Sequence, residues 1–259
     1  SKACDNLNEA IRLNPRDQRF HFEKGKAHFH LREFNQALKC YNQALSLDPN
    51  DAEVHFQKGE VFYELGEFEE ALDSYEKCLK LESDHIGGYV SKGMTYRKLS
   101  KFEEAINCYD SALLFEPDSF HAENNKGIAL RMMGKYEESV QSLKRAVSLK
   151  PKHGGYCSIG RSLEEMGREN EALEYYTKAI ATDPTKPSGY ELKANLYQIS
   201  GKHENSVYYW RKAISVDPNQ ATHYDNAGRN FVVMRNFQKF LDCCDDVLDL
   251  LHQEEEEDE

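Results

Sequence analysis

Residues 155–162, GYCSIGRS, differ by one side chain from the phosphate-binding loop G-x-x-x-x-G-K-[ST], because Arg161 stands at the lysine position. That loop binds phosphate with backbone N–H groups that are free because it joins a strand to the start of a helix. Here the preceding segment is predicted to be helical up to Pro151, and Gly160 to lie inside the next helix, where the N–H groups are already bonded. We therefore predict no nucleotide site.

Histidine and cysteine could instead bind a metal or act in catalysis. The segment HFEKGKAHFH holds His21, His28 and His30, but no pair has the i, i+4 spacing that places two ligands on one helix face. The seven cysteines include no C-x-x-C pair, and no Ser/His/Asp or paired-carboxylate arrangement stands out. The sequence thus predicts no catalytic residue, no metal site and no cofactor, and the chain is not expected to be an enzyme.

The composition limits the class of partner. Of the 259 residues, 39% are hydrophobic and 30% are charged, as in a folded domain, and the net charge of -12 argues against nucleic acid. Half of that charge lies in the last six residues, EEEEDE. No run of eighteen apolar residues and no signal peptide occur, and the odd number of cysteines is typical of reduced thiols. We expect a cytoplasmic protein that is not inserted in a membrane.

The elements that carry these residues repeat with a period of about 34 residues. One series of residues closes each copy: Pro15, Pro49, Ser83, Pro117, Pro151, Pro184 and Pro218. A second series runs in step with it: Gly25, Gly59, Gly93, Gly127, Gly160, Ala194 and Gly228. Repetition this regular predicts one supersecondary unit copied along the chain.

Each unit is predicted to be two antiparallel helices. In residues 52–83 apolar residues recur at helical spacing, and LGEF at 65–68 interrupts them. Small residues at Gly59 and Ala71 would let the two helices approach closely. The glycine of the interruption recurs and is expected to take the positive φ that ends a helix, at Gly66, Gly134, Gly167 and Gly201.

The third copy carries a family pattern. Its residues Tyr89, Gly93, Tyr96, Ala105 and Tyr109 match W-x2-L-G-x2-Y and A-x3-F, so the chain resembles the tetratricopeptide-repeat (TPR) family over nearly its whole length. The resemblance implies an all-α fold, a right-handed superhelical solenoid of helix-turn-helix repeats.

The domain prediction follows from the repeats. Residues 18–251 hold seven copies in one solenoid, starting near Gln18, Ala52, Ile86, Phe120, His153, Pro187 and Ala221. Residues 1–17 have the register of a second helix without its first, which predicts a truncated upstream repeat, since a repeat cannot bury its apolar face alone. The segment FLDCCDDVLDLLHQ is expected to be the closing helix, and residues 252–259 an acidic tail.

The resemblance also implies a groove lined by the first helix of each pair. Reading off the inward positions of that helix gives a candidate peptide-binding set: Lys26, Arg97, Lys98, Asn125, Arg131, Arg161, Asn195, Asn226 and Arg229. Arginine offers forked donors to carboxylates, and asparagine can bond an extended backbone, so an acidic or C-terminal peptide would suit this wall. A solvated face with ordinary side-chain scatter is the alternative. The carboxylate clamp of the chaperone-binding members does not carry over, because Phe22 with Lys26 and Phe56 with Glu60 do not match it.

The predicted function is a non-enzymatic scaffold or adaptor that holds a protein or peptide partner in the groove. One alternative is the recognition domain of a larger enzyme, such as a glycosyltransferase or phosphatase, with its catalytic part upstream. A third is self-association through the solenoid ends, or through the tail in a neighbour's groove.

Overall fold

The computed structural model describes residues 2–244, and the side chains of 7–244. Over this range the chain consists of α-helices and turns, without strands. The helices are α1 (Lys2–Leu13), α2 (Gln18–His30), α3 (Phe34–Leu47), α4 (Ala52–Leu65), α5 (Phe68–Leu81), α6 (Ile86–Lys98), α7 (Phe102–Phe115), α8 (Phe120–Met132), α9 (Tyr136–Leu149), α10 (His153–Glu165), α11 (Glu169–Thr182), α12 (Ser188–Ile199), α13 (His203–Val216) and α14 (Ala221–Val233). Residues 237–244 are again helical. The predicted acidic tail and the end of the predicted closing helix lie outside the described residues.

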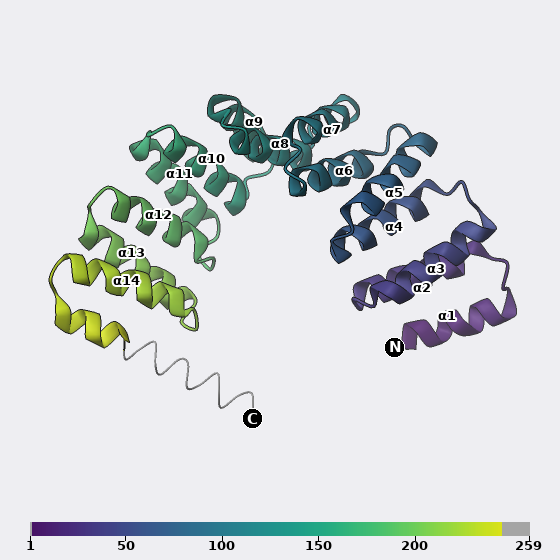
Figure 1. Cartoon of the computed structure of the whole chain (residues 1–259), viewed down its shortest axis with the longest axis horizontal. Helices are drawn as coiled ribbons and strands as arrows, with labels where there is room; N and C mark the ends of the chain where they lie inside the picture. Colours follow the sequence, from purple (N-terminus) through teal and green to yellow (C-terminus); the bar gives the residue numbers. More distant parts are fainter. Residues whose placement is uncertain (1, 245–259) are drawn as a thin grey trace. The chain divides into compact units, whose positions relative to one another are not determined.

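The chain divides into two compact units, residues 1–133 and 134–259. The first holds α1 to α8, and the second holds α9 to α14 and the helical residues 237–244 (Figure 1). Within each unit a helix packs against the next one along the chain, and the first helices of adjacent repeats also touch, as α4 does α6 and α10 does α12. Whether all seven repeats form one continuous solenoid stays a prediction.

A left-handed residue follows the first helix of every repeat. The predicted glycines Gly66, Gly134, Gly167 and Gly201 all have positive φ, between 71° and 78°, which confirms their role in the turn. The other three repeats place a residue with a side chain there, with φ between 57° and 59°: Arg32, Ser100 and Arg235. The backbone therefore imposes this conformation whether or not glycine is present.

In four repeats the two helices touch where a glycine faces a tyrosine ring. A Cβ added to Gly59 would lie 2.5 Å from Cε1 of Tyr75, and one added to Gly160 would lie 2.3 Å from Cε1 of Tyr176. Both tyrosines are fully buried. The ring fills the space that a side chain on the first helix would need, so glycine is required by packing there.

Candidate peptide-binding face

In the first unit, the first helices differ in chemistry along the predicted wall. Lys26 on α2 lies over the ring of Phe22 and pairs with Glu23 at 3.0 Å. Arg97 and Lys98 end α6, and Arg131 lies near the end of α8, which contacts α6. The wall thus runs from an aromatic part on α2 and α4 to a basic part on α6 and α8. This basic part is the best match to the predicted anion-binding character.

Arg97 combines charge with partial burial. Its Nε is buried and has no hydrogen-bond partner among the described residues, and the same holds for the hydroxyl of Tyr109 on α7. Burial raises the pKa of Tyr109 to about 12, while the positive charge of Arg97 opposes that rise. The tyrosine is therefore neutral at physiological pH.

Asparagine behaves in the same way in both units. Asn125 Nδ2 donates to the carbonyl oxygen of His121 at 2.9 Å, and Asn226 Nδ2 donates to that of Thr222 at 2.9 Å. Each amide thus donates one of its two N–H groups to its own helix, and its second N–H and its carbonyl oxygen remain for an extended peptide. Bonding of a peptide backbone by these two asparagines stays a prediction.

In the second unit, Arg161 on α10 and Asn195 on α12 are exposed. Arg229 on α14 is also exposed but pairs with Asp225 at 2.8 Å, so part of its charge is already neutralised. Arg161 is the stronger candidate of these two arginines for an anionic ligand.

Carboxylates on the same helices fix the buried tyrosines. The hydroxyl of Tyr75 donates to Glu60 Oε1 at 2.6 Å, and that of Tyr176 donates to Glu164 Oε2 at 2.6 Å. Burial is the largest cause that raises the pKa of both tyrosines, and the glutamates add to it. These two glutamates serve the packing between helices and are not free to act as an acid–base pair.

The residues that first suggested chemistry have packing roles. Gly160 lies inside α10 against Tyr176, as a helix-packing residue and not as part of a loop. His21 Nε2 lies 3.3 Å from the carbonyl oxygen of Pro15, and His55 repeats this contact with Pro49 at 3.0 Å. Within the described residues, no three His, Cys, Asp or Glu side chains are placed to hold a metal ion.

One cysteine lies beside a histidine. The Sγ of Cys157 is 3.4 Å from Nε2 of His153, whose Nδ1 lies 2.9 Å from the carbonyl oxygen of Ala179. Both side chains are buried, and burial raises the pKa of Cys157 to about 11. The thiol is therefore protonated at neutral pH and lacks the thiolate that a nucleophile needs.

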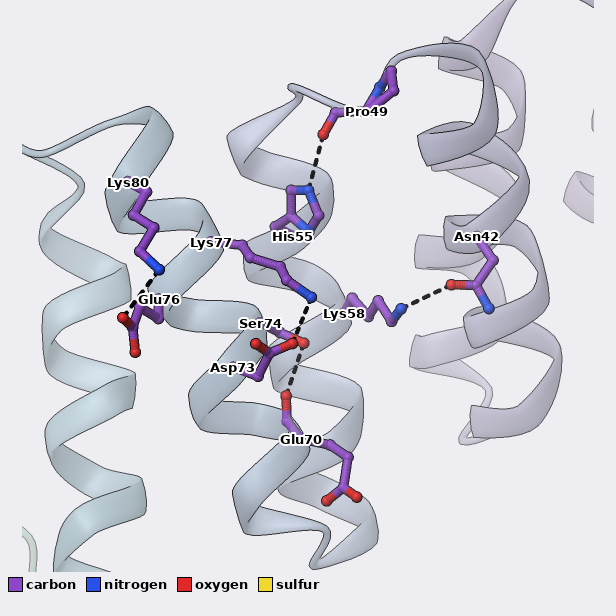
Figure 2. Close-up of polar contacts among 10 residues, drawn as sticks. All are labelled: Asn42, Pro49, His55, Lys58, Glu70, Asp73, Ser74, Glu76, Lys77 and Lys80. Atoms are coloured by element: carbon purple, nitrogen blue, oxygen red, sulfur yellow. Dashed lines mark hydrogen bonds and ion pairs between the residues drawn. The ribbon is translucent and has the colours of Figure 1, made fainter.

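A set of lysines that the sequence analysis missed joins adjacent repeats. At each of these junctions the seventh residue of a repeat, which lies on its first helix, contacts the second helix of the preceding repeat. The residue contacted is the ninth from the start of that second helix. The contacts are Lys58 Nζ to Asn42 Oδ1 (2.9 Å), Lys92 Nζ to Glu76 Oε2 (4.0 Å), Lys126 Nζ to Asp110 Oδ1 (2.5 Å) and Lys193 Nζ to Thr177 Oγ1 (2.8 Å). Figure 2 shows the first of them. The recurrence of lysine at 58, 92 and 126 was the available signal.

Comparison with protein families decides the identity of the repeats. A model described as TPR repeat matches residues 32–66, and models described as tetratricopeptide repeat match residues 52–85, 90–153, 154–186 and 187–220. The chain belongs to the tetratricopeptide-repeat family. Its TPR units are interaction modules, which supports a role as a protein-interaction scaffold. Among curated proteins no match was found.

Solved TPR structures have the same fold. The crystal structure of MamA is 22% identical with a TM-score of 0.59, covering 65% of this chain and 92% of MamA. A TPR protein from Parabacteroides merdae is 21% identical with a TM-score of 0.68, covering 88% of this chain and 91% of that one. YrrB, described as a TPR protein with an unusual peptide-binding site, is 22% identical with a TM-score of 0.58, covering 71% and 95%. The fold of this TPR chain is thus an all-α helical repeat solenoid.

None of the helices in the described part of this TPR chain combines the length and the apolar character needed to cross a bilayer.

Proposed function

We propose that this TPR chain is a non-enzymatic scaffold whose first helices hold an acidic segment of a protein partner. The observation that carries the proposal is the basic part of the wall in the first unit, where Arg97, Lys98 and Arg131 stand on two contacting helices. Arginine binds carboxylates through two parallel hydrogen bonds, and it is more weakly hydrated than lysine. Arg161, on α10 of the second unit, is a separate candidate for a carboxylate of the partner.

Two further observations support an acidic ligand. The Nε of Arg97 is buried, so a carboxylate bound there would interact in a medium of lower polarity than water. The chain as a whole is acidic, with a net charge of -12, so an acidic partner would be repelled by most of the surface and attracted by the cations of this wall.

The test is capture of partners by the purified chain with Arg131→Glu and Arg161→Glu. We expect the double variant to capture less of the partners while its helicity by circular dichroism stays unchanged. A matched control carries Lys39→Glu and Lys101→Glu, two exposed lysines on or beside second helices. Capture that is undiminished in the first variant, or that falls equally in the control, would contradict a role for the first-helix wall.

A further inference from the structure

The lysine that joins adjacent repeats is missing at two junctions of the second unit. Its position is taken by Ile159 on α10 and by Ala227 on α14. The facing ninth residue of the preceding second helix changes at the same two places: it is Lys144 on α9 and Arg211 on α13, where the other junctions have Asn, Glu, Asp or Thr. The positive charge has therefore moved to the other side of the junction and has lost its oxygen acceptor.

At the first of these junctions two lysines meet on one ring. Lys144 Nζ lies 6.0 Å from the centroid of Tyr175, and Lys178 Nζ lies 4.5 Å from it. Neither lysine forms an ion pair within the described part of the chain. Glu171, whose charge is close enough to act on Lys144, is itself bound by Arg168 Nε at 2.6 Å. Two ammonium groups thus lie near one aromatic ring, and the carboxylate that acts on Lys144 is already bound to an arginine.

The second junction repeats this arrangement. Arg211 Cζ lies 5.9 Å from the centroid of Phe231, and Lys239 Nζ lies 5.6 Å from it. These three side chains line a cavity of about 410 Å³ together with Met234 and, as its acidic group, Glu204. In the described residues neither cation has an ion-pair partner. A third cation on the same helices, Lys212, lies 5.8 Å from the centroid of Tyr208, a ring that is 56% exposed.

A cavity in the first unit shares two lining positions with this one and is mainly acidic. It has a volume of about 450 Å³ and is lined by Lys58, Phe62, Glu69, Glu70, Asp73 and Ser74. Phe62 holds the repeat position of Phe231, and Glu70 holds that of Lys239. The cations around it have oxygen partners: Lys58 reaches Asn42, and Lys77 pairs with Asp73 (Figure 2). The cations beside this cavity are thus paired, whereas Arg211 and Lys239 have no ion pair among the described residues.

We propose that the two cation pairs, Lys144 with Lys178 and Arg211 with Lys239, form a second binding surface for an acidic segment of a protein partner. This surface lies on second helices of the second unit and is distinct from the first-helix wall. Each carboxylate of the segment would contact two exposed cations that lie near the same aromatic ring, and the two charges would act on it together. The acceptors that are missing at these junctions would be supplied by the partner.

Nucleic acid fits this surface less well. Its binding strength comes from many phosphates neutralised at once, whereas here a few cations stand on a chain of net charge -12. A short run of aspartate or glutamate needs only the local pairs.

The test measures binding of a fluorescent Glu-rich peptide by anisotropy, in a background with Arg131→Glu and Arg161→Glu so that the first-helix wall contributes little. We expect Lys144→Glu with Lys178→Glu to weaken binding roughly tenfold, and Arg211→Glu with Lys239→Glu to do the same. Replacing Lys144 and Lys178 by Gln should give a smaller loss in the same direction. The same peptide with Gln in place of Glu should not bind.

The matched control is Lys77→Glu with Lys80→Glu on α5, which changes the net charge equally and places one substitution at the repeat position of Lys178. Binding should be unchanged in this control. An equal loss in the control, or no binding of the Glu-rich peptide at all, would overturn the proposal. Tighter binding of single-stranded RNA, lost in the same variants, would also overturn it and indicate a nucleic-acid surface. Because the first-helix wall is already disabled, these outcomes leave the proposed function untouched.

Discussion

The glycine that faces a tyrosine ring is the residue on which the packing of four helix pairs depends. Gly160 and Gly154 lie on the same helix, but an added Cβ would strike Tyr176 at the first and would have nothing within 4 Å at the second. Gly160→Ala should therefore lower the unfolding free energy by about 1–3 kcal/mol, because the ring or the helix must shift. Gly154→Ala is the matched control and should leave stability unchanged or raise it by up to about 1 kcal/mol. Chemical denaturation followed by circular dichroism measures both, and equal effects would contradict the packing role.

A second prediction at the scale of the residue concerns the turn after each first helix. Ser100 has φ 59°, a conformation that costs a residue with a side chain about 1–2 kcal/mol. Ser100→Gly removes this cost and adds some entropy to the unfolded chain, so a net gain of about 0.5–1 kcal/mol is expected in the unfolding free energy. Gly66→Ala, at φ 78°, should be destabilising. A loss of stability in Ser100→Gly would show that its side chain makes a contact worth more than the strain.

At the scale of the helix, the start of α6 depends on an unusual cap. Asp51 caps α4 by accepting from Val54 N at 3.0 Å, whereas His85 Nδ1 accepts from Gly88 N at 2.8 Å. His85→Ala should cost about 1 kcal/mol of stability, and His85→Asn should keep most of it, because the amide oxygen can accept the same bond. Thermal unfolding of both variants provides the measurement. Equal losses would indicate that the other contacts of the histidine ring, with Phe56 at 4.8 Å and with Glu53 at 3.4 Å, matter more than the cap.

Adjacent repeats meet at two kinds of junction between helices. One pairs a lysine on the first helix with an oxygen on the preceding helix, as Lys126 with Asp110, and the other reverses the roles, as Ile159 with Lys144. Asp110→Lys alone should be destabilising, because two ammonium groups then face each other at a half-buried junction. Adding Lys126→Ile recreates the reversed pair and should recover most of that loss. Unfolding free energies of the two single variants and the double variant test this; strictly additive effects would show that the pairs are independent.

At the scale of the whole molecule, charge separates the surfaces that the chain offers to partners. The net charge is -12, whereas Arg97, Lys98 and Arg131 in the first unit, and the cation pairs in the second unit, are local exceptions. Capture of an acidic partner should therefore weaken as salt rises, since the screening length falls from about 10 Å at 0.1 M to about 3 Å at 1 M. Capture measured across this range would contradict both proposed surfaces if it were unchanged or stronger at high salt.

Much of the fold could be predicted because its signals are local and repeated. The spacing of glycine and proline predicted where each first helix begins to within one residue. The one difference is α12, which begins at Ser188 and not at Pro187. The left-handed turns at Gly66 and its equivalents followed from glycine alone. Arg32, Ser100 and Arg235 could not be recognised in that way, because their residue types do not report the φ that the neighbouring helices impose.

The candidate sites were predictable only in part. Residue type and repeat position by themselves determined that Arg97, Lys98, Arg131 and Arg161 occupy first-helix positions and that no phosphate loop exists at Gly160. Only the tertiary structure decided which charges have partners: it bonds Asn125 to its own helix and pairs Arg229 with Asp225. It alone brought Lys144 and Lys178 onto one ring. The physical reason is that a repeat fixes where a side chain starts, whereas its partner is set by how adjacent helices pack and by how far a flexible side chain reaches.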